Sequence, residues 1–133
     1  MPSMKILLIA GGWSSEREVS LTGARGMQEA LLKRGHAVTF FDLLENFDEL
    51  LETARQHDFA LINLHGSPGE DGLVQAMLEK AGCPYQGSGP SGSFLALNKA
   101  AAKQIFRMAG LPTADWEFLP VRPAEGWEPR LPW

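Results

Sequence analysis

The chain has 133 residues, of which 44% are hydrophobic, and its formal net charge at pH 7 is −4. This length is sufficient for one domain with a substantial apolar core and short for two. The acidic balance gives no electrostatic reason to expect nucleic acid or an anionic membrane surface as a partner.

The sequence shows no sign of export or of membrane insertion. No apolar run approaches the ~20 residues that a transmembrane helix needs, and the start lacks the regions of a signal peptide. The single Cys83 cannot form an internal disulfide, which fits a reducing compartment, and we expect it to be buried as a small hydrophobic residue. A cytoplasmic protein is therefore predicted.

The first apolar run, from Lys5 to Ala10, is almost uninterrupted, which is typical of a parallel strand buried on both faces. Gly11 and Gly12 end this strand and let the backbone turn sharply. Ser15 and Glu18 then have the spacing of a capping box that opens a helix. In a parallel sheet such a corner lies at the carboxyl edge, where ligands bind and free amides favour anions.

Glu16 falls at the first helical position in this interpretation. A carboxylate there is stabilised by the helix dipole, stays ionised, and is suited to bind an ammonium group. An ordinary acidic residue of a first helical turn explains the same spacing. The spacing leaves both interpretations open.

Apolar periodicity predicts further strands and helices along the chain. Strands are expected at 37–41 and 59–64, and helices at 15–34, 46–55, 72–80, with Asp71 as a cap, and 99–109. Alternating strands and helices favour right-handed crossovers. We therefore predict an α/β fold, a Rossmann-like three-layer domain with a mainly parallel sheet, over residues 1–117. Residues 118–133 are rich in proline and are predicted to be a linker or the start of another domain.

Two more polar residues follow predicted secondary structure. His65 comes directly after the third strand, so it shares the sheet edge of Glu16, and both a structural and a functional role fit it. Glu70 either supports the loop after His65 or is one more first-turn acid. Lys99 lies near a helix start, where the dipole disfavours a cation, and a bound ligand would explain a lysine at this position. An ordinary surface lysine fits the sequence as well.

Three stretches resemble signatures of the D-alanine–D-alanine ligases, in the family's order and with compatible spacing. They are residues 11–21, residues 64–72, and residues 85–89 followed by Leu97-Asn98-Lys99. These ligases belong to the ATP-grasp superfamily, whose members have an amino-terminal α/β domain, a central domain and a carboxy-terminal domain. The resemblance covers residues 4–116 and implies that the chain is the amino-terminal, pre-ATP-grasp domain.

The resemblance also implies an activity for the full-length enzyme. In the family, ATP phosphorylates the carboxylate of one D-alanine, and the amine of a second D-alanine attacks the acyl phosphate to form the dipeptide of peptidoglycan. It implies that Glu16 and His65 are catalytic: Glu16 binds the ammonium of the first D-alanine, with Val19 near its methyl group, and His65 lies near the reacting carboxylate. Lys99 is expected to reach the ATP phosphates.

ATP and magnesium or manganese are the cofactors that the resemblance implies, with the metal ligands in domains outside this chain. We therefore expect the chain alone to have no ligase activity, and the full-length enzyme to be a homodimer. Two positions depart from the family's pattern: Asn98 stands where many members have aspartate, and Trp13 stands where a smaller or basic residue is frequent. Neither departure removes an expected contact.

Three alternatives remain. A non-catalytic Rossmann-like dimerisation module would use Glu16 and His65 only for capping and packing. A dinucleotide-binding domain is disfavoured, because Gly11-Gly12 lacks the Gly-x-Gly-x-x-Gly pattern. A ligase with another second substrate, such as D-lactate or D-serine, cannot be distinguished, because that pocket belongs to another domain.

Overall fold

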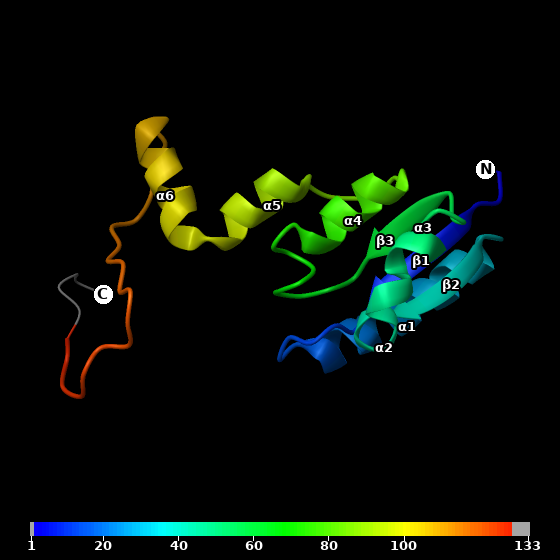
Figure 1. Ribbon diagram of the computed structural model, residues 1–133, viewed down its shortest axis with the longest axis horizontal. Coiled ribbons are helices and arrows are strands. Elements are labelled where there is room, and N and C mark those ends of the chain that lie inside the picture. The colour runs from blue at the N-terminus through cyan, green and yellow to red at the C-terminus, as the bar shows by residue number, and fades with distance from the viewer. Residues whose placement is uncertain (1, 129–133) are drawn as a thin grey trace. The chain divides into compact units, whose positions relative to one another are not determined.

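A computed structural model describes residues 2–128, which form two compact units that divide between Leu97 and Asn98 (Figure 1). The elements of the first unit are β1 (Lys5–Ala10), α1 (Arg17–Lys33), β2 (Ala37–Asp42), α2 (Leu43–Asn46), the 3-10 helix η1 (Phe47–Glu49), α3 (Leu50–Ala54), β3 (Phe59–Ile62), α4 (Leu73–Ala81) and α5 (Pro90–Leu97). The second unit contains α6 (Lys99–Met108). No helix of the described residues is both long and apolar enough to cross a membrane.

The sheet has the strand order β2-β1-β3, and both neighbours run parallel to the central β1. β3 ends at Ile62, two residues earlier than predicted. At this last residue, Gln86 Oε1 accepts from the Ile62 amide at 2.9 Å and Gln86 Nε2 donates to the Ile62 carbonyl at 2.6 Å. A side chain thus pairs the outer edge of β3 at this residue.

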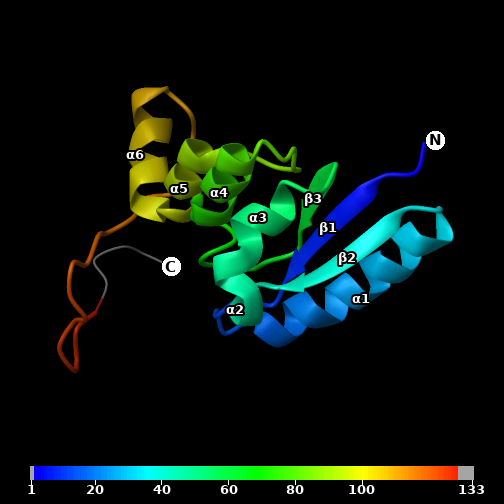
Figure 2. The ribbon, with the colours of Figure 1, turned by 45° about the vertical axis from the view of Figure 1, so that its right-hand side comes forward.

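The strand β1 is buried on both faces, and its residues alternate between two apolar clusters. Leu7 and Ile9 pack in the cluster that includes residues of α3 and α4, whereas Leu8 and Ala10 pack with residues of α1. Figure 2 shows α1 on one side of the sheet and α3 and α4 on the other. Cys83 is buried in the first cluster, as expected. The predicted three-layer α/β fold is confirmed.

The start of α1 differs from the sequence prediction. The helix begins at Arg17, and the N-cap is Glu16, whose side chain makes no capping bond. The predicted capping box of Ser15 and Glu18 is therefore wrong. The hydroxyl of Ser14 accepts from the Glu16 amide at 3.2 Å, and the Ser14 carbonyl accepts from the Arg17 amide at 3.2 Å. This turn delays the helix, so Glu16 occupies the N-cap and not the first helical position.

The predicted helix at 46–55 is three short segments, α2, η1 and α3. Helical structure starts directly after β2, because the Asp42 side chain accepts from the Leu44 amide at 3.1 Å and caps α2. α4 has Gly72 at its N-cap in the left-handed conformation. Asp71 nevertheless serves this helix start, since its Oδ1 accepts from the Leu73 amide at 3.0 Å.

Ser20 joins α1 to the ends of two strands. Its side chain is fully buried, its Oγ accepts from the Gly11 amide at 2.8 Å, and its hydroxyl donates to the Asn63 carbonyl. The Asn63 side chain donates back to the Ser20 carbonyl at 2.7 Å. Gly23 leaves room for this contact, because a Cβ there would lie 3.1 Å from Asn63 Nδ2. The polar groups that follow β1 and β3 are therefore paired through one helix.

Replacing Ser20 by alanine is expected to destabilise the chain by about 1–3 kcal/mol, because the buried Gly11 amide loses its acceptor and the Asn63 carbonyl its donor. The free energy of unfolding, measured by urea denaturation and circular dichroism, tests this expectation.

The matched control is Ser3→Ala. The Ser3 hydroxyl donates to the Gly35 carbonyl at 2.7 Å, but in an exposed position, so we expect a change within about 0.5 kcal/mol. Equal effects of the two variants would show that the buried network contributes no more than a surface hydrogen bond.

Candidate functional site

Two loops meet at the carboxyl edge of the sheet. The turn at 11–16 follows β1, and the loop at 63–72 follows β3, which runs parallel to β1. A Cβ placed on Gly12 would lie 3.3 Å from Leu64 Cδ2 and 3.6 Å from Pro68 Cδ. The turn and the loop therefore lie close together.

Glu16 lies at this junction. A Cβ placed on Gly66 would come within 3.9 Å of Glu16 Oε2 and 3.5 Å of Ser14 Cβ, so the Glu16 carboxylate lies beside the loop at 63–72, close to the residue that follows His65. Glu16 is exposed, and His65 is half-buried. The structure thus places the two on the same edge of the sheet, as expected from the sequence. Val19 lies on the first turn of α1 with 61% of its surface exposed.

The loop after His65 is closed by its own side chains. Glu70 Oε2 accepts from the Gly66 amide at 3.0 Å, and the Glu70 amide donates to the Gly66 carbonyl at 2.8 Å. The Ser67 hydroxyl donates to Asp71. Of the two roles open for Glu70, the structure shows support of the loop.

The glycine at position 69 is required by the packing of this loop. A Cβ there would lie 2.1 Å from Leu64 Cβ, a separation that no side chain tolerates. The Gly69 carbonyl accepts from Gln75 Nε2 at 2.6 Å. Gln75 is buried, and its Oε1 has no hydrogen-bond partner among the described residues. The conformation of the loop is therefore set by α4 as well as by Glu70.

Sequence reasoning missed an ion pair next to the turn. Arg17 Nη1 donates to Asp42 Oδ1 at 2.7 Å, and Arg17 Nη2 donates to Asp42 Oδ2 at 2.5 Å. The side chains are 24% and 14% exposed, so the pair is largely shielded from water. The acidic residue at the end of the second strand could have indicated this pair, because Asp42 lies at the same sheet edge as the start of α1, where Arg17 stands.

The pair shifts the pKa of both partners. The hydrogen bonds from Arg17 hold the pKa of the Asp42 carboxyl below its usual range, with a further contribution from the Leu44 amide. Asp42 in turn raises the pKa of the Arg17 guanidinium, again chiefly through the hydrogen bonds. Both groups therefore stay charged at neutral pH.

An open groove of about 460 Å³ lies on the outer side of this pair, between α1 and β2. Arg25, Phe40 and Glu45 line it together with Arg17 and Asp42. None of the residues expected to bind substrate lines this groove. It is distinct from the junction of the turn and the loop.

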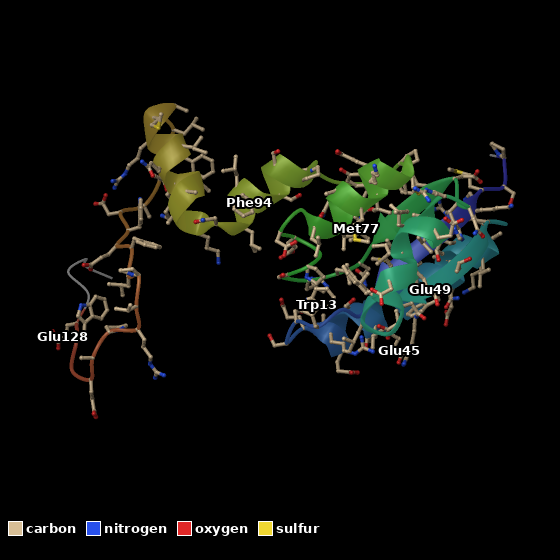
Figure 3. All side chains as sticks on the ribbon, in the orientation of Figure 1. Trp13, Glu45, Glu49, Met77, Phe94 and Glu128 are labelled. Carbon is tan, nitrogen blue, oxygen red and sulfur yellow. The ribbon has the colours of Figure 1, made fainter. Side chains whose placement is uncertain are left out.

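Trp13 is exposed over 45% of its surface but has an aromatic neighbour. Its ring meets that of Phe47 edge-on, with ring centres 5.4 Å apart and planes at 70°. Figure 3 labels Trp13 on the turn that follows β1. The large residue at this turn position is thus accommodated by packing against η1.

The second unit contains Lys99. It is the exposed first residue of α6, as expected, and the side chain of Asn98 accepts from the Ala101 amide at 3.1 Å. Asn98 therefore caps the helix in place of the family's frequent aspartate. Within residues 2–128, no three histidine, cysteine, aspartate or glutamate side chains gather into a group that could hold a metal ion.

Asp42→Asn is expected to make the free energy of unfolding less dependent on pH between pH 7 and pH 3. Because the folded-state pKa of Asp42 is depressed, its contribution is fully present above the unfolded pKa of about 3.9 and is lost as pH falls through the lower folded value. The variant should therefore be less stable than the wild type at pH 7, and the difference should shrink near pH 3. Urea denaturation at both pH values measures it.

The control for this experiment is Asp48→Asn, on the exposed surface of η1. We expect it to change the unfolding free energy by less than about 0.5 kcal/mol at either pH. A difference between wild type and Asp42→Asn that stays constant from pH 7 to pH 3 would contradict the depressed pKa.

The chain is similar in sequence to known ligases, although no family model matches it. It is 76% identical to the D-alanine–D-alanine ligase of Desulfovibrio desulfuricans over 130 residues, which are 98% of this chain and 42% of that ligase. It is 70% identical to the D-alanine–D-alanine ligase of Nitratidesulfovibrio vulgaris over 128 residues, 96% of this chain and 42% of that protein. The chain thus spans about two fifths of the length of these relatives.

Solved structures agree with the sequence comparison. The D-alanine–D-alanine ligase of Bacillus anthracis complexed with ATP matches with a TM-score of 0.79 and 40% identity, over 88% of this chain and 38% of that one. D-alanyl-alanine synthetase A of Vibrio cholerae matches with a TM-score of 0.72 and 30% identity, over 90% and 41%. Along almost its whole length, the chain therefore matches the amino-terminal α/β domain of D-alanine–D-alanine ligases in sequence and in fold.

Proposed function

We propose that this chain is the part of a D-alanine–D-alanine ligase that binds the first D-alanine, with Glu16 as the receptor for its ammonium group. The observation that carries the proposal is the place of the Glu16 carboxylate, which is exposed at the start of α1 and lies beside the loop at 63–72, close to the residue that follows His65. The positive end of a helix dipole favours a negative charge, and a carboxylate attracts an ammonium group.

We propose roles for the other expected site residues as well. Val19 follows Glu16 by three residues, so it lies near the same side of the helix start, and its exposed side chain can contact the substrate methyl. His65 would lie near the carboxylate that is phosphorylated. Lys99 would bind the ATP phosphates, and it is exposed at the start of α6.

The proposed reaction of the complete enzyme has two steps. A carboxylate oxygen of the first D-alanine attacks the γ-phosphorus of ATP, and the bond to ADP breaks. The amine of the second D-alanine then attacks the acyl carbon, and phosphate leaves as the amine loses a proton. The product, D-alanyl-D-alanine, serves peptidoglycan synthesis. Another second substrate would change only the second step.

The catalytic metal is proposed to lie outside this chain. Magnesium or manganese would neutralise charge on the transferring phosphoryl group when bound. Residues 2–128 have no group of three candidate ligands, so no step is assigned to the metal through residues of this chain. We further propose that residues 1–117 form the substrate-binding domain and that 118–133 lead to the next domain.

The complete enzyme is proposed to be a cytoplasmic homodimer. Sedimentation of the complete enzyme tests the dimer, and a monomer at high concentration would contradict it. Fractionation of cells tests the location, and recovery with the membrane fraction would contradict it.

Glu16→Gln in the complete ligase is expected to reduce D-alanine-dependent phosphate release from ATP by about tenfold to a hundredfold at low D-alanine. The physical reason is the loss of a charge-assisted hydrogen bond to the substrate ammonium, worth about 1.5–3 kcal/mol. Glu18→Gln is the matched control, because it removes the same charge from the same end of α1. We expect less than a twofold effect from it.

Equal losses in the two variants would mean that helix-end charge, and not a contact of Glu16, is responsible. His65→Gln in the same assay tests the second expected residue, and unchanged phosphate release would remove His65 from the site. If the wild-type enzyme released no phosphate with D-alanine, the ligase proposal itself would be wrong.

The 133-residue chain by itself is expected to release no phosphate from ATP with D-alanine, because it contains no described metal-binding group and spans about two fifths of its relatives. Phosphate release by the isolated chain above the rate of a Glu16→Gln chain would contradict this expectation.

A further inference from the structure

The Arg17–Asp42 pair is attached to the turn that carries Glu16. Besides its two bonds to Asp42, Arg17 Nη1 donates to the Gly12 carbonyl at 3.3 Å. Arg17 is also the residue directly after Glu16 and the first residue of α1. The guanidinium therefore connects the beginning of the turn to the last residue of β2, and the Arg17 backbone continues directly from the end of the turn.

Asp42 is itself held in place by three further interactions. Its Oδ1 accepts from the Leu44 amide at 3.1 Å, and its carbonyl accepts from Asn46 Nδ2 at 3.1 Å. It is also paired in the sheet with Ala10, the last residue of β1. Asp42 is thus held in place on its backbone and on its carboxylate, to which the Arg17 side chain is bonded.

The ion pair also fills the space above the turn. Gly11 has a φ of +78°, and a Cβ there would lie 2.5 Å from Arg17 Nη1 and 2.6 Å from Asp42 Oδ1. On the next residue, Gly12, a Cβ would meet Leu64 at 3.3 Å. The turn therefore runs between the ion pair and the loop after β3, with no room for a side chain at Gly11.

We infer that the bidentate Arg17–Asp42 pair is a positioning element that holds the turn at 11–16 so that the Glu16 carboxylate meets the ammonium of the first substrate. The inference rests on the proposed function of Glu16. A planar guanidinium fixes both the distance and the orientation of a carboxylate, which a lysine cannot do. Small displacements of a binding group reduce activity strongly.

The decisive variant is Arg17→Lys in the complete ligase, because it keeps the positive charge and removes the planar guanidinium with its two parallel hydrogen bonds. The KM for the first D-alanine is expected to rise by about tenfold, and the KM for ATP to change less than twofold. KM does not depend on the amount of active enzyme, so partial unfolding alone would lower the maximal rate without producing this pattern. Asp42→Asn should give the same pattern.

The control is Arg55→Lys, because Arg55 makes an exposed ion pair with Glu52 at 3.1 Å, away from the turn. It should leave both KM values unchanged within twofold. The double variant Glu16→Gln/Arg17→Lys gives the second test. If Arg17 acts through Glu16, the lysine should add less than twofold to the effect of Glu16→Gln.

Each outcome bears on a different claim. A raised D-alanine KM in Glu16→Gln with normal values in Arg17→Lys would overturn the positioning role and leave the proposed function intact. Effects that multiply in the double variant would show that Arg17 acts independently of Glu16 and would also overturn it. A normal D-alanine KM in Glu16→Gln would overturn the proposed function, and with it the role of the pair.

Discussion

The burial of β1 on both faces is the constraint on which the rest of the structure depends. Its side chains alternate between the cluster beneath α3 and α4 and the cluster beneath α1, and it is also the central strand of the sheet. Because β2 and β3 pair with it in parallel, all three strands end at one edge. A backbone that leaves such a strand needs partners for its polar groups, and short polar side chains supply them at this edge.

Several hydrogen bonds and an ion pair hold the backbone in place at this edge of the sheet. Ser20 connects α1 to the ends of β1 and β3, Arg17 connects it to the end of β2, and Glu70 closes the loop after His65. Removing an ion pair from water costs free energy that offsets much of its attraction. The largely shielded Arg17–Asp42 pair is therefore better explained by the geometry it imposes on the turn than by stability alone.

Two departures from the family's sequence pattern are accommodated by local contacts. Asn98 caps α6 through its side-chain oxygen, which is the bond an aspartate would also accept. Trp13 packs edge-on against Phe47, so this contact accommodates a large side chain at a turn position where a smaller residue is frequent. Both residues therefore have local contacts that fit them to their positions.

The spacing of Ser15 and Glu18 led to a wrong capping box, and the error has a physical cause. A hydroxyl two residues from an amide competes well for it, and Ser14 takes the Glu16 amide before the helix begins. The edge shared by Glu16 and His65 was nevertheless predictable. It follows from the parallel direction of the strands and needs no detail of the turn.

The sequence by itself determined the α/β alternation, a first strand buried on both faces and the edge at which the candidate site lies. These features follow from apolar runs and glycine turns, which involve residues close together in the sequence. The sequence also carried the family resemblance that the comparisons confirm. Only the tertiary structure decided the partners of Arg17 and Ser20, which lie 25 and 43 residues away at Asp42 and Asn63. Hydrophobic periodicity cannot predict such pairs, because it is the order and register of the strands that bring these residues together.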